Sequence, residues 1–143
     1  MPAHVLFFYV LLLGSCGYAL AKGGRPERQV AAMFLAATLL SKMAAWEVSG
    51  HFIDFEVRLF AIDLALLVGL AAVALTSDRY WPLWLTTLHA YTVVAHLGRL
   101  LGPATIFHVY VGNSGLTVDP ALVLLAVATW RHARRAAAGI AEQ

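Results

Sequence analysis

Ionisable side chains interrupt apolar stretches of this sequence that are long enough to cross a lipid bilayer. These side chains are Lys42, Glu56, Asp63, His89, His96 and Arg99. A charged group near the middle of a membrane costs about 2.5 to 3.5 kcal/mol on insertion scales, so such groups normally face the interior of a helical bundle or a wet cavity. Intramembrane ionisable residues often serve proton relays or ion pathways, and we treat these six as a candidate polar intramembrane site.

One polar stripe is expected along the segment LHAYTVVAHLGRL at residues 88–100. At 100° per residue, its polar side chains fall within about 80° of one another on an α-helix. The members of the stripe are His89, Thr92, His96 and Arg99. On the preceding apolar segment, Glu56 and Asp63 are seven residues apart, so they also share a helix face.

Matching the heights of residues across antiparallel helices predicts two charge pairs. Glu56 comes level with the neighbourhood of Arg99, and Asp63 comes within a turn of His96. Lys42 approaches Asp63 in the same way across the preceding hairpin. We therefore predict that Glu56 pairs with Arg99, and that Asp63 pairs with Lys42 or His96.

Each pair has a structural and a functional interpretation. We interpret Glu56 with Arg99 as a contact that holds helices together, because it lies near the expected membrane surface. For Asp63 and its two candidate partners, both interpretations stay open. His89 lies deeper and has no acidic partner at its expected height, so we expect it to hydrogen-bond to a neighbouring helix or to its own backbone.

Catalytic and metal-binding motifs are absent, so we assign no catalytic residue and no metal site: there is no H-E-x-x-H, P-loop, dinucleotide fingerprint or nucleophile elbow. Cys16 is the only cysteine, which excludes an intrachain disulfide. His89 and His96 are about 10.5 Å apart along a helix axis, too far to bind one metal ion or one haem iron together. A haem would need a further ligand such as His51 or His108, and haem is retained only as an alternative cofactor.

The composition places the chain among membrane proteins. Hydrophobic residues make up 61% of the 143 residues and charged residues 13%, against about 25% charged residues in soluble domains. Strands are not expected, because no sustained alternation is present and an open sheet cannot sit in lipid. The predicted fold is an all-α transmembrane bundle. The net charge of +2 gives no case for nucleic-acid binding.

The apolar segments predict a single domain over residues 1–143 with about five helices and four to five crossings. The expected helices cover about 4–21, 30–49, 54–76, 81–101 and 119–135. The first four have roughly 17 to 23 residues, enough to cross about 30 Å of hydrocarbon. Residues 22–29 are expected to be a turn and residues 103–118 an interfacial or partly helical link. Asp119 and Pro120 resemble a helix N-cap and first helical residue.

Cations indicate the orientation. With five alternating helices, one side of the membrane receives Lys22, Arg25, Arg28, Arg79, Arg131, Arg134 and Arg135. The positive-inside rule then places the C-terminus in the cytoplasm and the N-terminus outside.

Three motifs carry a family resemblance. SDRYWPLW at 77–84, HLGRLLGP at 96–103 and WRHARR at 130–135 resemble small uncharacterised polytopic inner-membrane proteins of alphaproteobacteria. The resemblance covers about the last 65 residues and consists of a turn, an aromatic belt and a basic end. It implies a multi-pass protein of the bacterial inner membrane and brings no activity with it.

Small residues favour association as the leading functional hypothesis. Gly14 to Gly17 and the G-x-x-x-G spacing of Gly98 and Gly102 would allow helices to approach closely. The protein would then be an accessory subunit of a membrane complex or a homo-oligomer, with lipid and membrane proteins as its partners. The alternatives are a small transporter or proton-relay protein with an outward-facing polar site, and a b-type haem protein or membrane-embedded enzyme.

Overall fold

The computed structural model describes residues 3–47, 52–101 and 107–139, and the side chains of all of these except 47, 52–55, 99, 101 and 107–117. Over these residues the chain forms five helices and no strand, which confirms the all-α prediction. The helices are α1 (Ala3–Lys22), α2 (Arg25–Glu47), α3 (Phe52–Thr76), α4 (Trp81–Leu101) and α5 (Phe107–Ala137).

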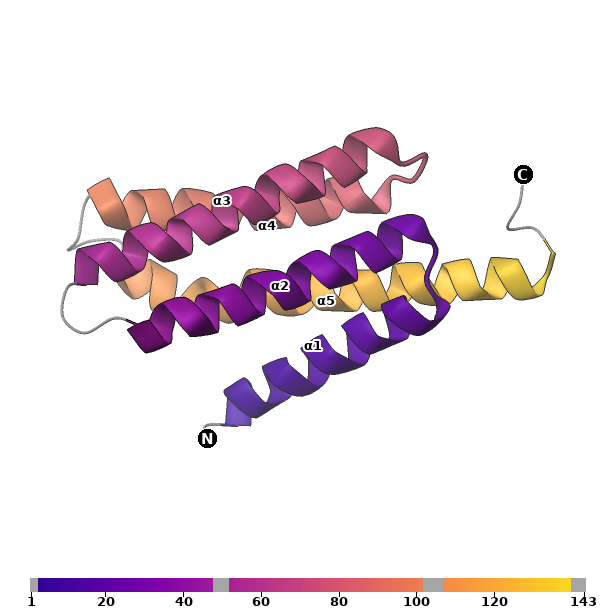
Figure 1. The fold of residues 1–143 in the computed structure, drawn as a ribbon, viewed down its shortest axis with the longest axis horizontal. Helices are drawn as coiled ribbons and strands as arrows, with labels where there is room; N and C mark the ends of the chain where they lie inside the picture. Colours follow the sequence, from indigo (N-terminus) through magenta and orange to yellow (C-terminus); the bar gives the residue numbers. More distant parts are fainter. Residues whose placement is uncertain (1–2, 48–51, 102–106, 140–143) are drawn as a thin grey trace.

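The five helices form an antiparallel bundle in which the two termini lie at opposite ends (Figure 1). Each helix contacts the next one along the chain, and α5 also contacts α1 and α2. The last helix thereby closes the bundle. The α1–α2 and α3–α4 turns lie at the same end as the C-terminal part of α5 (Figure 1).

The connection between α1 and α2 is shorter than the expected turn over residues 22–29. Only Gly23 and Gly24 separate the two helices. Pro26 does not break the chain, because it stands in the first turn of α2, where its missing N–H would have no helical partner. A Cβ at Gly23 would collide with the carbonyl oxygen of Ala19, so this tight turn requires glycine.

The prediction for the last helix was wrong at its start. Helix α5 begins at Phe107, and Asp119 and Pro120 lie inside it rather than at its N-terminus. Proline removes one hydrogen bond from the helix, but packed membrane helices tolerate it because neighbouring groups satisfy the carbonyl that loses its partner. Asp119 therefore stands about 18 Å along the helix from Phe107, at 1.5 Å per residue.

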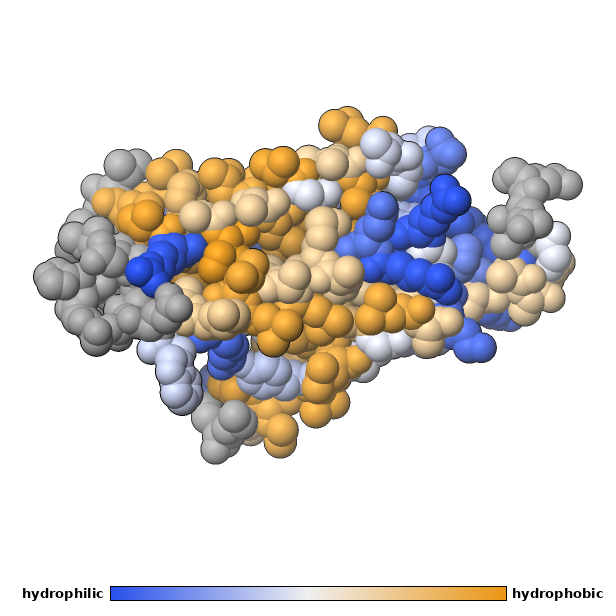
Figure 2. Space-filling model, in the orientation of Figure 1, coloured by the Kyte–Doolittle hydropathy of each residue, from blue (hydrophilic) through white to orange (hydrophobic). Residues whose placement is uncertain are grey.

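Apolar side chains occupy both the interior and the outer surface of the bundle. The fully buried leucines are Leu70, Leu85, Leu122 and Leu125. Large apolar side chains such as Val68 and Leu75 are exposed at 64% and 84%, and an apolar band covers the middle of the molecule in Figure 2. Such a surface suits lipid rather than water.

Three helical segments of the described chain are long and apolar enough to cross a membrane. These segments are Ala3–Lys22, Arg25–Trp46 and Glu56–Thr76. Helices α4 and α5 carry more polar residues within their length, including the two histidines of α4 and Asp119 of α5.

Candidate functional site

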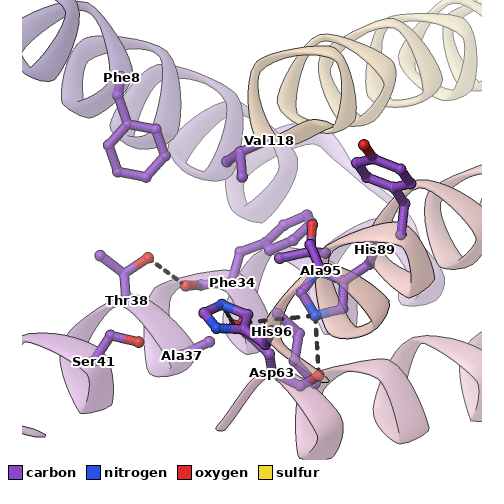
Figure 3. Close-up of a pocket in the computed structure, with 13 residues that line it drawn as sticks. Phe8, Phe34, Ala37, Thr38, Ser41, Asp63, His89, Ala95, His96 and Val118 are labelled. Carbon is purple, nitrogen blue, oxygen red and sulfur yellow. Dashed lines mark hydrogen bonds and ion pairs between the residues drawn. The ribbon is translucent and has the colours of Figure 1, made fainter. Parts of the chain in front are cut away.

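Helices α3 and α4 pack against each other and bring four ionisable side chains into one network, three of which are drawn in Figure 3. Glu56 and Asp63 come from α3, and His89 and His96 come from α4. Within each helix the two residues are seven positions apart, about two turns or 10.5 Å. Since the helices are antiparallel, the acidic residues and the histidines alternate along the bundle axis.

His96 lies between the two carboxylates. Its Nδ1 is 2.6 Å from Oε1 of Glu56, and its Nε2 is 2.9 Å from Oδ2 of Asp63. His96 and Glu56 are almost fully buried, with exposed fractions of 3% and 1%. Both ring nitrogens are therefore engaged by carboxylates, and the Glu56 side of the ring is shielded from solvent.

These contacts require at least two protons in the triad. Each of the two short contacts needs one proton between its heavy atoms. Either His96 is an imidazolium that donates to two ionised carboxylates, or a neutral ring donates to one carboxylate and accepts from the other, protonated acid. In both arrangements the three groups share two protons and carry one net negative charge.

His89 extends the network toward the middle of the bundle. Its Nε2 lies 3.0 Å from the backbone oxygen of Asp63 and 3.8 Å from Oδ1 of the same residue. The hydrogen bond to a neighbouring helix is present as expected, but the expectation that His89 lacks an acidic partner was wrong. Height matching placed Asp63 within a turn of His96, whereas in the structure Asp63 contacts both histidines of α4.

The remaining predicted site residues lie apart from this network or outside the described side chains. Lys42 is exposed, and its Nζ stands 5.2 Å from the centre of the Tyr9 ring. Of the two partners considered for Asp63, the structure thus selects histidine. The side chains of Arg99, His51 and His108 lie outside the described part, and with them the Glu56–Arg99 pair and the additional haem ligands.

A cavity of about 250 Å³ adjoins the network (Figure 3). Asp63, His89 and His96 form its polar wall. The opposite wall is contributed by α1, α2 and α5; it is mostly apolar, with Phe8, Phe34 and Val118, and α2 adds the hydroxyl groups of Thr38 and Ser41. A ligand in this cavity would meet ionisable groups on one side and a mostly apolar surface on the other.

An apolar layer separates the network from the end of the bundle that holds the α1–α2 turn. Leu70 follows Asp63 by two helical turns on α3, and Leu85 precedes His89 by one turn on α4. Both leucines are fully buried, as is Leu122 of α5. The described residues therefore offer no continuous polar path from the network to that end.

A second polar cluster, which the sequence reasoning missed, stands at the far side of this layer. Nη2 of Arg79 lies 3.1 Å from Nδ1 of His132, and Nη1 lies 3.9 Å from Oε1 of the fully buried Glu27. A Cβ at Gly24 would come within 2.9 Å of the His132 ring and 3.1 Å of a Glu27 oxygen. The cluster thereby links the α1–α2 turn and the α3–α4 turn to α5.

A signal for Glu27 was present in the sequence. Glu27 lies at helical spacing from Val30, Ala31 and Phe34, all of which are buried. It therefore stands on the inward face of α2. We had assigned it to a solvated turn because glycine and proline precede it.

Comparison with known proteins adds no assignment: no protein-family model matches this chain, and no curated protein or solved structure is significantly similar to it. The fold defines the class of the protein. Its described residues are all-helical, and three of the helices are long and apolar enough to cross a membrane. Among the described residues, no group of three or more His, Cys, Asp or Glu side chains is arranged to hold a metal ion.

Proposed function

We propose that the chain is a multi-pass protein of the bacterial inner membrane in which all five helices cross the bilayer. The positive-inside rule supports an outer N-terminus and a cytoplasmic C-terminus. The antiparallel order supports this orientation, since it gathers the two turns and the basic end of α5 at one end of the bundle (Figure 1). Helices α4 and α5 have 21 and 31 residues, which is enough to span hydrocarbon.

Within that frame, we propose a small transporter or proton-relay protein that takes up a proton together with a ligand in the cavity. The observation that carries this proposal is the position of His96 between the buried carboxylate of Glu56 and the partly exposed carboxylate of Asp63. The three groups carry one net negative charge in either arrangement, so a carboxylate of the triad can accept a third proton. A small hydrogen-bonding ligand with an apolar body would contact the same groups from the cavity. The network extends toward the end of the bundle where α2 ends and α3 begins, which the proposed orientation places outside. Protons and ligands would therefore enter from outside.

The proposed site takes Glu56, Asp63, His89 and His96 as its proton-exchanging groups. Arg99 remains our expected counter-ion for Glu56, as the heights of the two residues indicate. Lys42 is not part of the proposed site, because its amino group contacts the ring of Tyr9 instead. The apolar layer around Leu70 and Leu85 favours an occluded binding site over an open proton channel.

Infrared difference spectroscopy of the purified protein between pH 5 and pH 8 tests proton uptake. The carbonyl stretch of a protonated carboxyl group should grow at low pH in the wild type and shrink in Asp63→Asn and Glu56→Gln. Asp78→Asn is the matched control, because Asp78 is an exposed acid at the other end of the bundle. A carboxyl band that is unchanged in both site variants would rule out the proposal.

Association, as an accessory subunit or a homo-oligomer, is the second candidate, and the outer face of α1 favours it. Ser15 and Cys16 are buried within the bundle, whereas Gly14 and Gly17 are exposed with open space around them. Two glycines on a lipid-facing surface allow another helix to approach closely. Cross-linking in mild detergent tests this role: a complex should form in the wild type and weaken in Gly14→Leu, and a monomer without any partner argues against it.

The haem or enzyme hypothesis has less support from the histidines. Both nitrogens of His96 are engaged by carboxylates, and Nε2 of His89 donates to a backbone oxygen. Axial ligation by His96 would require the loss of one carboxylate contact. An absorbance scan of the purified protein for a Soret band tests the haem version directly.

A further inference from the structure

Two adjoining depressions open at the end of the bundle that holds the α1–α2 and α3–α4 turns. The larger, of about 600 Å³, is polar, and its lining includes Arg25, Gln29, Ser77, Arg79 and Arg135. The smaller, of about 220 Å³, runs between the start of α4 and the last third of α5. Asp78, Arg79 and Arg135 line both depressions, so the two form one continuous surface.

The larger depression has the donors that a phosphate group requires. The guanidinium groups of Arg25, Arg79 and Arg135 belong to three different elements and share this one lining. Arginine binds phosphate oxygens through two parallel N–H groups and keeps its charge at any physiological pH. Asp78 is the acidic side chain in the described lining, and it is exposed.

Arg79 is held in place before any ligand arrives. Its Nη2 lies within hydrogen-bond distance of Nδ1 of His132, at 3.1 Å, and its Nη1 lies 3.9 Å from the carboxylate of the buried Glu27, close enough for charge attraction. Its side chain is 28% exposed, so it is fixed at the base of the surface rather than extended into solvent. Ordering a flexible arginine side chain opposes binding, and here the fold has already supplied that order.

The smaller depression has a different character. Trp81, Leu124, Val127 and Ala128 give it an apolar floor, and Arg131 lies among its lining residues. An apolar groove that continues from an arginine-lined depression matches an amphipathic molecule with an anionic head. Figure 2 shows hydrophilic residues gathered at this end beside the apolar band, the level at which lipid headgroups lie.

We propose that this surface binds the phosphate group of an anionic phospholipid, with part of the lipid's apolar body in the groove between α4 and α5. The recognised chemistry is a phosphate ester, and the apolar groove favours a lipid over a soluble phosphate. The site lies across the apolar layer from the His96 network and does not depend on the proposed proton uptake.

Native mass spectrometry of the full-length protein released from detergent tests this proposal. The probes are phosphatidylglycerol and phosphatidylcholine with identical acyl chains, and glycerol phosphate as a soluble phosphate. The double variant Arg25→Ala/Arg135→Ala removes two exposed arginines of the surface. The matched control Arg28→Ala/Arg134→Ala removes the same charge from neighbouring positions of the same helices, outside both described linings.

The wild type should retain phosphatidylglycerol in preference to phosphatidylcholine. The Arg25/Arg135 variant should bind phosphatidylglycerol about tenfold or more weakly, and the Arg28/Arg134 control should stay within about threefold of the wild type. Equal losses in the two variants, or equal retention of both lipids, would overturn the proposal. Displacement of phosphatidylglycerol by glycerol phosphate at matched concentration would assign the site to soluble phosphates and overturn the lipid assignment.

Discussion

Oδ2 of Asp63 lies 2.9 Å from Nε2 of His96, in the interior of a bundle whose outer surface is apolar. The same aspartate accepts a hydrogen bond from His89 through its backbone oxygen. One residue of α3 thus holds two histidines of α4 at different heights. This arrangement fixes the register of α3 and α4. A change in the charge of the network should therefore change the stability of the protein as well as its function.

Removal of the His96 ring should destabilise the protein strongly. His96→Ala would leave two carboxylates close together without the group that separates them, and removing one member of a buried charge network typically costs about 3 to 5 kcal/mol. The measurement is the midpoint of thermal unfolding in detergent. His4→Ala is the control, because His4 is exposed on α1. Equal midpoints for the two variants would contradict a buried, charged triad.

His89 should carry a proton on Nε2. A backbone carbonyl can only accept a hydrogen bond, so the ring nitrogen that faces Asp63 must carry the proton. Nitrogen NMR of protein labelled with ¹⁵N-histidine distinguishes the two tautomers, and the loss of one signal in His89→Gln assigns it. A signal with the proton on Nδ1 would show that the contact to the Asp63 carbonyl is not formed.

Alanine should be tolerated at Gly14 and not at Gly24. A Cβ at Gly24 would press on the His132 ring and on Glu27, and such overpacking costs about 1 to 3 kcal/mol. A Cβ at Gly14 meets nothing within 4 Å, and alanine stabilises a helix by up to about 1 kcal/mol over glycine. Thermal midpoints of the two variants in detergent measure both effects. A loss of stability in Gly14→Ala would instead indicate a partner helix at this face.

Proteoliposomes that contain the wild-type protein should keep an imposed pH gradient about as long as protein-free liposomes. The reason is the apolar layer around Leu70 and Leu85, because a proton cannot cross buried leucines without water or exchanging groups. A pH-sensitive dye inside the vesicles reports the decay of the gradient. Rapid decay, abolished by His96→Gln, would mean that the polar path continues to the other end.

Labelling of introduced cysteines tests the proposed orientation. Ala138 is exposed just after α5 and should react with an impermeant maleimide only after the inner membrane is opened, since we place it in the cytoplasm. The experiment uses Cys16→Ala/Ala138→Cys, which removes the native thiol. Labelling of intact spheroplasts at residue 138 would reverse the proposed topology.

The sequence by itself determined the class of the fold and most helix positions. An apolar composition, lengths near those needed to span hydrocarbon and the absence of alternation leave an all-helical bundle as the solution. Helix α4 matched its expected bounds, because Pro82 favours a first helical turn and Gly102 and Pro103 follow its last residue in the sequence. The inward direction of the His89 and His96 stripe also followed from helical periodicity alone.

Helix ends predicted from proline were wrong where tertiary packing outweighs the local preference of the chain. Pro26 indicated the end of a helix and Pro120 the start of one, but the first stands inside an opening turn and the second inside a continuous helix. Pro26 costs its helix no hydrogen bond, because the first N–H groups of a helix have no helical partner. Pro120 removes one, and burial of the flanking apolar residues against neighbouring helices exceeds that cost. This balance depends on neighbours that the sequence does not identify.

Tertiary structure alone decided the partners of the charged groups. Periodicity gives the face of a helix to within a fraction of a turn, but a hydrogen bond requires heavy atoms about 3 Å apart. An axial shift of one residue, 1.5 Å, is enough to exchange one partner for another. For that reason the sequence could place Asp63 near His96 yet could not foresee that it also binds His89, or that Glu27, Arg79 and His132 meet across two turns and α5.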